Sequence, residues 1–245
     1  MAAPQFFVDP ADLTGELAVF RGDEAHHAAR VLRLQRGERL RLADGRGRVA
    51  EATAVAVRDA EVVAQVGTVR VEPVPVPALT FVVGLVKGGK LDLVVQKLTE
   101  LGVDRVAPAV CRRSVVAWDQ RKAAAARDRW AAIALAAAKQ SHRARVPTVA
   151  AVACLPDQVA AAAGRGPVLV CWENSRHPLS AALPGQPPAE LAVVVGPEGG
   201  LEAGEVAACE AAGAVAVSLG PLVLRSETAA IATAAAVAFR YGQLG

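Results

Sequence analysis

The chain has 245 residues, 53% of them hydrophobic and 21% charged, and its formal net charge is +3. This composition excludes a disordered chain. It also excludes a membrane helix, because no apolar stretch without charged residues reaches the length of about 18 residues that is needed to span a bilayer. The first ten residues lack the basic and apolar regions of a secretory signal, so we expect a cytoplasmic protein.

The first 72 residues are predicted to form a small β-barrel with one helix. Period-two patterns predict strands over residues 6–8, 17–20, 38–43, 49–57 and 61–70. Between the second and third of these strands, Asp23 can cap a helix that continues to Leu34. Prolines at every second position of residues 73–78 remove backbone donors and favour an extended linker, so we place the domain boundary there.

A second domain of the α/β class is predicted over residues 79–245. Apolar runs predict buried strands over residues 79–86, 103–110, 168–172, 191–195 and 214–219. Helical patterns alternate with them over residues 90–101, 119–140, 158–163, 203–212 and 227–241. Such alternation is typical of a mostly parallel sheet that carries helices on both faces.

Basic residues are concentrated in the middle third of the chain. Residues 73–149 carry 13 basic and 5 acidic side chains, against 10 and 11 in residues 1–72 and 4 and 8 in residues 150–245. The excess fits either solvated helix faces or a surface that contacts phosphates. The clusters at residues 112–113 and 139–145 favour the phosphate interpretation.

The cysteines give no sign of a metal site or a disulfide framework. Cys111, Cys154, Cys171 and Cys209 lie far apart and form no CxxC or Cys/His cluster. We therefore expect reduced, buried thiols and no bound metal.

Residues 84–91 resemble a phosphate-binding P-loop, because they follow a strand, open a helix and fit the G-x-x-x-x-G-K pattern. Leu91, however, occupies the position of the Ser or Thr that would bind Mg²⁺, and no second acidic metal ligand is evident. We therefore favour a function based on the C-terminal glycine-rich turns, described next, over an NTPase.

Two glycine-rich turns near the C-terminus carry the clearest functional signal. A buried strand leads into Gly196-Pro197-Glu198-Gly199-Gly200-Leu201, and a second leads into Leu219-Gly220-Pro221 and then Leu224-Arg225-Ser226-Glu227-Thr228-Ala229. Ligands of open α/β sheets bind beyond the carboxyl ends of the strands, where glycine lets main-chain groups approach. We therefore expect both turns to contribute to one ligand pocket.

These turns resemble the signature of the RsmE-type 16S ribosomal RNA uracil-N3 methyltransferases, a family of the SPOUT superfamily. The resemblance extends upstream to residues 27–33, 87–103, 113–116 and 140–147. Three positions depart from the family pattern: Leu222 replaces a common arginine, Lys139 a usual glutamate and His142 a usual glycine. These departures affect the expected RNA contacts and leave the glycine-rich turns intact.

The resemblance implies a PUA-like RNA-binding barrel, a SPOUT domain with a trefoil knot, and a homodimer that acts on 16S ribosomal RNA or the small ribosomal subunit. It implies that S-adenosylmethionine is bound by Trp172, Gly196, Pro197, Gly199, Gly200, Leu201, Leu219, Gly220, Leu224, Ser226, Thr228 and Ala229. The candidates for RNA binding are His27, Arg30, Arg33, Lys87, Lys90, Arg112, Arg113, Arg143 and Arg145.

The expected reaction needs a cation and a base and does not require a metal. Uracil N3 becomes nucleophilic as its proton leaves, and negative charge then develops on the flanking oxygens. Arg225 is the candidate cation, because its guanidinium stays charged and presents a fork of donors. Glu227 and Glu198 are candidate bases, although a carboxylate near a helix start also stabilises exposed N–H groups. For Glu198 we favour this structural role, and for Glu227 both roles stay open.

Two further functions stay open on the sequence alone. A SPOUT ribose 2′-O-methyltransferase would share the cofactor turns and present a different RNA atom. A non-catalytic RNA-binding protein could keep the fold without binding the methyl donor.

Overall fold

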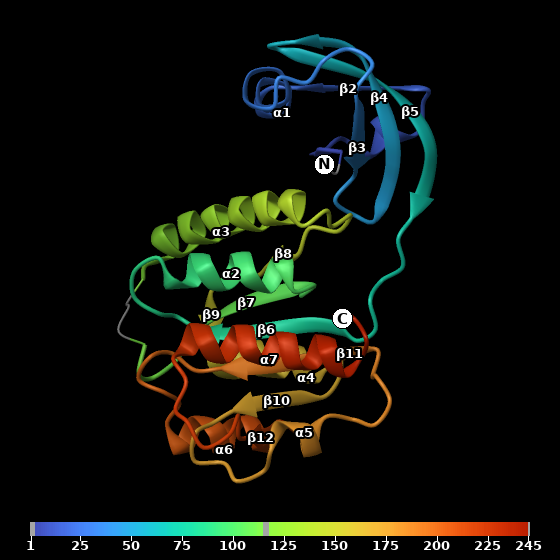
Figure 1. Ribbon diagram of the computed structural model, residues 1–245. Coiled ribbons are helices and arrows are strands. Elements are labelled where there is room, and N and C mark those ends of the chain that lie inside the picture. The colour runs from blue at the N-terminus through green and yellow to red at the C-terminus, as the bar shows by residue number, and fades with distance from the viewer. Residues whose placement is uncertain (1–2, 115–117, 245) are drawn as a thin grey trace. The chain divides into compact units, whose positions relative to one another are not determined.

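The computed structural model describes residues 3–114 and 118–244 (Figure 1). The chain forms two compact units, the first of which runs to Val74 and also includes residues 138–146. The second contains residues 75–137 and 147 onward. The division at Val74 falls within the segment predicted as a linker. Residues 138–146, by contrast, pack with the first unit although they lie inside the predicted domain 79–245, and the other predicted domain limits stay a prediction.

The first unit is built on one curled sheet of five strands. The strands lie in the order β1 (Gln5–Phe7), β3 (Arg39–Ala43), β4 (Arg48–Arg58), β5 (Glu61–Val71) and β2 (Leu17–Arg21). All neighbours are antiparallel except β1 and β3. Register shifts in β4 next to Ala50 and Ala54 bend the long β4–β5 ribbon, as Figure 1 shows. The predicted strands and the PUA-like character of this unit are confirmed.

The predicted helix over residues 23–34 is shorter than expected. An α-helix, α1, covers only Asp23–His26, and a π-helical turn, η2, follows over His27–Val31. The N-cap is Gly22, whose φ of 63° suits glycine, so the prediction that Asp23 caps the helix is wrong. Arg33 has a φ of 53°, which takes the chain out of the helix before Leu34. A short 3₁₀ helix, η1 (Pro10–Leu13), has no counterpart among the predicted elements.

Polar contacts fix residues 138–146 to the first unit. The Gln5 side-chain amide donates a hydrogen bond to the Arg143 carbonyl at 2.8 Å, and Lys139 forms an ion pair with Glu24. His142 has a φ of 56°, in the left-handed region where glycine is favoured. This left-handed backbone conformation explains why glycine is usual at position 142 in the family that the sequence resembles. Lys139, which replaces a usual glutamate, pairs with the carboxylate of Glu24.

The second unit is a parallel sheet of seven strands. Its order is β12 (Val215–Val217), β10 (Val168–Cys171), β11 (Glu190–Val195), β6 (Ala78–Gly84), β7 (Arg105–Val110) and β8 (Thr148–Val149), and β9 (Ala153–Cys154) also pairs with β7. Every pair is parallel. The predicted α/β class is confirmed, and the two-residue strands β8 and β9 are additions to it. The trefoil knot stays a prediction.

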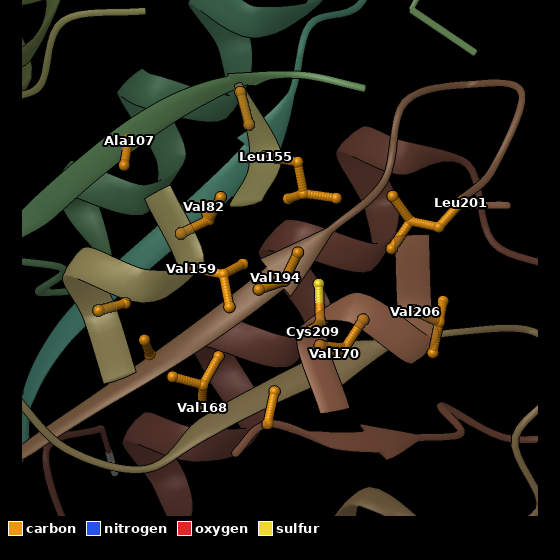
Figure 2. Close-up of a cluster of buried hydrophobic side chains, with 14 of the residues drawn as sticks. Val82, Ala107, Leu155, Val159, Val168, Val170, Val194, Leu201, Val206 and Cys209 are labelled. Atoms are coloured by element: carbon orange, nitrogen blue, oxygen red, sulfur yellow. The ribbon is translucent and has the colours of Figure 1, made fainter. Parts of the chain in front are cut away.

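Helices cover this sheet and bury its Val-rich strands. On one side α4 (Leu155–Ala163) packs with α6 (Ala203–Ala211), and on the other α2 (Lys90–Glu100) packs with α7 (Ser226–Arg240). The remaining helices are α3 (Gln120–Gln140) and α5 (Leu179–Ala182). Figure 2 shows the core beneath α4 and α6, where Val159, Val194 and Val206 point into one cluster. No helix in residues 3–114 and 118–244 has the length and hydropathy to cross a membrane.

The cysteines are less uniformly buried than expected. Cys111 and Cys209 are buried and Cys171 is half-buried, but Cys154 is exposed, so the expectation of buried thiols is wrong for that residue. Its position explains the difference, because Cys154 ends the short strand β9 and is the N-cap of α4. Within the described residues, no group of His, Cys, Asp and Glu side chains could hold a metal ion.

Candidate functional site

The carboxyl ends of three neighbouring strands form one side of a pocket. Cys171 at the end of β10 lies beside Val195 of β11 and Val217 of β12, so the loops that follow these strands start at the same edge of the sheet. Between these loops lies a pocket of about 220 Å³. The structure thus brings together the two glycine-rich turns that the sequence singled out.

Eleven of the twelve residues predicted to bind the cofactor line this pocket: Trp172, Gly196, Pro197, Gly199, Gly200, Leu201, Leu219, Gly220, Leu224, Ser226 and Ala229. Thr228 does not line it and is exposed. The pocket is also lined by residues beyond those predicted to bind the cofactor: Cys171, Glu173, Val195, Glu198, Ser218, Pro221, Leu222 and Val223. Most of these residues are direct sequence neighbours of the predicted ones, so their position next to the glycine-rich motifs could have indicated that they line the pocket.

Glycines are needed in the loop over residues 196–200 and at Gly84 because atoms of neighbouring residues lie very close. A Cβ atom on Gly84 would lie 2.5 Å from the backbone nitrogen of Pro197, and one on Gly196 would lie 2.9 Å from Cγ of Leu201. Gly200 has a φ of 71°, in the left-handed region. Leu201 then inserts into the core cluster of Figure 2, which anchors the end of the loop. Gly84, which resembled the first glycine of a P-loop, is required here for close packing.

Ser226 joins the two glycine-rich turns directly. Its hydroxyl donates a hydrogen bond of 2.6 Å to the carbonyl of Gly196, and the side chain is buried. Ser226 is the first residue of α7, so the bond ties the start of that helix to the loop after β11. A buried polar pair of this kind holds the two walls of the pocket in one arrangement.

Glu198 is held by the segment that resembled a P-loop. Its carboxylate accepts a hydrogen bond from Nζ of Lys90 at 2.9 Å and lies 3.3 Å from the backbone nitrogen of Lys87. Partial burial alone would raise the pKa of Glu198, but the bonds to Lys90 and to backbone N–H groups outweigh it, so the pKa lies below its ordinary value. Glu198 is therefore ionised at neutral pH, and Lys90 is engaged with a protein carboxylate.

Trp172 and Cys171 also line the pocket. The indole Nε1 of Trp172 is buried without a hydrogen-bond partner among the described residues, and the residue packs against the core cluster. Burial raises the pKa of the Cys171 thiol to about 11, so this side chain is a neutral thiol at pH 7.

The two predicted catalytic residues lie next to the lining and are not part of it. Arg225 is the N-cap residue of α7, between the lining residues Leu224 and Ser226. Its side chain is exposed, with no hydrogen bond or ion pair within the part of the chain that the structure describes. Glu227 is half-buried in the first turn of α7, and its Oε2 is buried with no partner among those same residues.

The structure separates the roles of Arg112 and Arg113. The Arg113 guanidinium donates a hydrogen bond of 3.0 Å to the carbonyl of Gly199, so this side chain supports the pocket loop. The side chain of Arg112 is 75% exposed, and its backbone N–H donates to the Glu205 carboxylate at 2.8 Å. The segment 113–116, part of the family resemblance, continues into residues 115–116, which lie outside the described residues.

The side chain of Arg145 forms hydrogen bonds within the first unit. Its guanidinium donates to the carbonyl of Glu72 at 2.9 Å and to the carbonyl of Arg46. It lies against Gly47, where a Cβ atom would come within 2.4 Å of the guanidinium carbon. The side chain of Arg145 therefore links residues 138–146 to the barrel, which the sequence alone did not indicate.

The other predicted RNA-binding residues of the first unit lie on its N-terminal helical segment and on residues 138–146. Arg30 forms an ion pair with Asp59, and the ring of His27 stands edge-on to Phe6 at 6.4 Å. Arg33 is exposed next to them in sequence. Arg143 is half-buried, and its carbonyl accepts the bond from Gln5. In the second unit Lys87 is exposed.

Two family models match the chain. Residues 72–238 match an RNA methyltransferase domain, and residues 20–60 match an RNA methyltransferase PUA domain. The first match spans more than half of the chain and includes every residue that lines the pocket.

Curated relatives and a solved structure agree with these matches. The chain is 39% identical to ribosomal RNA small subunit methyltransferase E of Mycobacterium bovis, over 97% of this chain and 92% of the relative. It is 33% identical to the protein of the same name from Bacillus subtilis, over 89% and 88%. A crystal structure of ribosomal RNA small subunit methyltransferase E from Neisseria gonorrhoeae bound to S-adenosyl methionine superposes with a TM-score of 0.88, at 26% identity and 98% coverage of both chains.

Proposed function

This chain belongs to the ribosomal RNA small subunit methyltransferase E family, and we propose that it transfers a methyl group from S-adenosylmethionine to N3 of a specific uridine in 16S ribosomal RNA. The observation that carries the proposal is the pocket formed by the two glycine-rich turns. Its residues lie within the matched methyltransferase domain, and a relative of the same fold is bound to S-adenosyl methionine.

The pocket fits an adenosyl ligand that is held mainly by main-chain atoms. Gly196, Gly199 and Gly200 expose backbone where a side chain would collide with its surroundings. Leucines and Ala229 of the lining supply apolar contact. The predicted cofactor residues that line the pocket are the ones we assign to this ligand. When bound, S-adenosylmethionine supplies an electrophilic methyl group.

We assign the catalytic roles at the uracil base to Arg225 and Glu227. The guanidinium of Arg225 is exposed beside the pocket, where it can stabilise the negative charge that develops on a uracil oxygen. Glu227 follows two positions later, in the first turn of α7, and its nearness in sequence to Arg225 and to the lining residue Ser226 supports its assignment as the group that accepts the N3 proton. The neutral Cys171 thiol is unsuited to act as a nucleophile.

In this proposal, RNA phosphates are bound by basic residues of both units. Arg33 and Lys87 are exposed, and Arg112 is exposed although its Nε lies 4.0 Å from the Glu202 carboxylate. Arg30, His27 and Arg143 complete the set, and of these Arg30 also pairs with Asp59. Arg113, Lys90 and Arg145 are bonded to the protein's own carbonyl or carboxylate groups, so we assign them a supporting role. Substrate recognition of folded RNA needs such backbone contacts around an accessible base.

We further propose that the protein acts in the cytoplasm as a homodimer. Three large apolar side chains of the second unit are strongly exposed: Leu222 (76%), Val223 (86%) and Phe239 (72%). Exposed apolar groups of this size favour burial against a partner, and a second copy of the chain is the partner that the family resemblance implies. The mass in solution, measured by light scattering, tests this assignment.

The decisive experiment is nucleoside analysis of 16S ribosomal RNA after incubation with the protein and S-adenosylmethionine, both as naked RNA and as small subunits. We expect 3-methyluridine. A 2′-O-methylated nucleoside would assign the chain to the ribose methyltransferases instead. RNA binding without any methylation, and without binding of the methyl donor in calorimetry, would leave a non-catalytic RNA-binding protein.

A further inference from the structure

The ionisable residues that line the pocket are all acidic. Among the lining residues in the described part of the chain there are two carboxylates, Glu173 and Glu198, and no lysine, arginine or histidine. Glu198 is balanced by Lys90 at 2.9 Å. Glu173 has no hydrogen bond or ion pair to a side chain within the residues that the structure describes. The lining therefore carries one negative charge that the pocket itself does not neutralise.

The carboxylate of Glu173 lies close to the turn at Gly200. Glu173 follows Trp172, directly after β10, and its Oε1 lies 2.8 Å from the place of a Cβ atom on Gly200. A side chain at position 200 would displace this exposed carboxylate, and the φ of 71° at Gly200 favours glycine there independently. The glycine-rich loop and this carboxylate thus lie next to each other in the pocket lining.

We propose that Glu173 makes the pocket selective for a cationic adenosyl ligand, so that the protein distinguishes the methyl donor from its demethylated product. This inference rests on the proposed function. S-adenosylmethionine carries a sulfonium, an ammonium and a carboxylate, a net charge of +1, whereas S-adenosylhomocysteine has a neutral thioether and no net charge. A nearby carboxylate attracts the first ligand and is indifferent to the second.

The selectivity has a consequence for turnover. When the methyl group moves to the uracil nitrogen, the sulfur keeps the electron pair of the broken bond and loses its positive charge, and the proton of N3 leaves to a base. The attraction to Glu173 therefore weakens at the step that forms the product. Release of the spent ligand becomes easier, and a new donor molecule competes better for the pocket.

Calorimetric titration of the full-length protein with three ligands tests the proposal: S-adenosylmethionine, S-adenosylhomocysteine, and sinefungin, which carries an amine in place of the sulfonium. The variants are Glu173→Gln, which keeps the shape and removes the charge, and Glu210→Gln as the matched control. Glu210 is also exposed and in the second unit, but it does not line this pocket. Thermal unfolding confirms that both variants are folded.

For Glu173→Gln we expect the dissociation constants of the two cationic ligands to rise about fivefold at low salt, with that of S-adenosylhomocysteine unchanged. High salt should shrink the difference, since screening weakens the attraction. Glu210→Gln should leave all three constants unchanged. An equal loss for all three ligands, or no loss for any, would overturn the inference while leaving the proposed function intact. Failure of the unmodified protein to bind any of the three would instead overturn the proposed function.

Discussion

The hydroxyl of Ser226 lies 2.6 Å from the carbonyl oxygen of Gly196, although 30 positions separate the two residues in the chain. One residue begins α7 and the other begins the glycine-rich loop after β11. Both groups are buried, so neither can exchange this hydrogen bond for one with water. The shape of the pocket between the two turns depends on this bond.

The variant Ser226→Ala should therefore be less stable and bind the cofactor less well. Removing the hydroxyl leaves the Gly196 carbonyl buried without its partner, at an expected cost of about 1–2 kcal/mol in the free energy of unfolding. Denaturant unfolding and calorimetry with S-adenosylmethionine measure the two effects. Ser180→Ala is the control, because Ser180 is exposed on α5. Equal behaviour of the two variants would show that the bond does not hold the pocket.

Gly84→Ala should damage the pocket although Gly84 does not line it. The added methyl group would lie 2.5 Å from the nitrogen and 2.6 Å from Cδ of Pro197, so the loop has to move. Overpacking of this kind costs about 1–3 kcal/mol in stability, and we expect a loss of cofactor affinity as well. Gly185→Ala is the matched control, since a Cβ atom at Gly185 has no neighbour within 4 Å. Normal cofactor binding by Gly84→Ala would contradict the tight packing of this loop.

The ion pair of Glu198 predicts a specific dependence of stability on pH. Because the pKa of Glu198 is lowered in the folded protein, its ionised form stabilises the fold at pH values above the ordinary glutamate pKa, about 4.3. This contribution is lost as the pH falls through the lowered value. The stability difference between the unmodified protein and Glu198→Gln should thus be constant near neutral pH and shrink below about pH 4.

Urea denaturation at a series of pH values measures this difference. Glu210→Gln provides the control, because the carboxylate of Glu210 has no ion pair within the described residues. A difference for Glu198→Gln that stays constant down to the lowest pH would mean that the bond to Lys90 does not stabilise the fold.

Much of the fold was accessible from the sequence because buried strands and amphipathic helices leave clear periodic patterns. The strands β6, β10 and β11 consist mostly of apolar residues, and nearly all of their residues are buried. The strands β8 and β9 have two residues each, too few to form a pattern. The packing of residues 138–146 on the first unit was not predictable either, because it depends on hydrogen bonds from Arg145 to distant backbone carbonyls.

The pocket was predictable to the extent that glycines mark it. Ser226 and Ala229 are three positions apart on α7 and both line the pocket, whereas Glu227 and Thr228 between them are not part of the lining. The family signature includes all four residues, and only the helix geometry separates them. Glu173 gave no signal in the sequence, because its relation to Gly200 arises from the approach of two loops in space.

Arg112 and Arg113 should respond differently to substitution, although they are neighbours in the basic segment. Arg112→Ala should weaken RNA binding, reduce its dependence on salt by about one phosphate contact, and leave cofactor affinity unchanged. Arg113→Ala should weaken cofactor binding too, because the guanidinium supports the carbonyl of Gly199. RNA binding at several salt concentrations and calorimetry with S-adenosylmethionine distinguish the two. Equal cofactor affinity for both variants would remove the supporting role of Arg113.

Arg225→Ala should retain the cofactor and lose the reaction. The side chain lies outside the pocket lining and has no partner within the described residues, so its removal should not disturb the loops that hold the ligand. If its guanidinium stabilises the charge on the uracil oxygen, the single-turnover rate should fall by about 100-fold or more. Arg225→Lys keeps the charge without the fork of donors and should recover only part of that rate. Because single-turnover rates exclude product release, a normal rate for Arg225→Ala would place this residue outside the chemical step and restrict it to a contact with RNA.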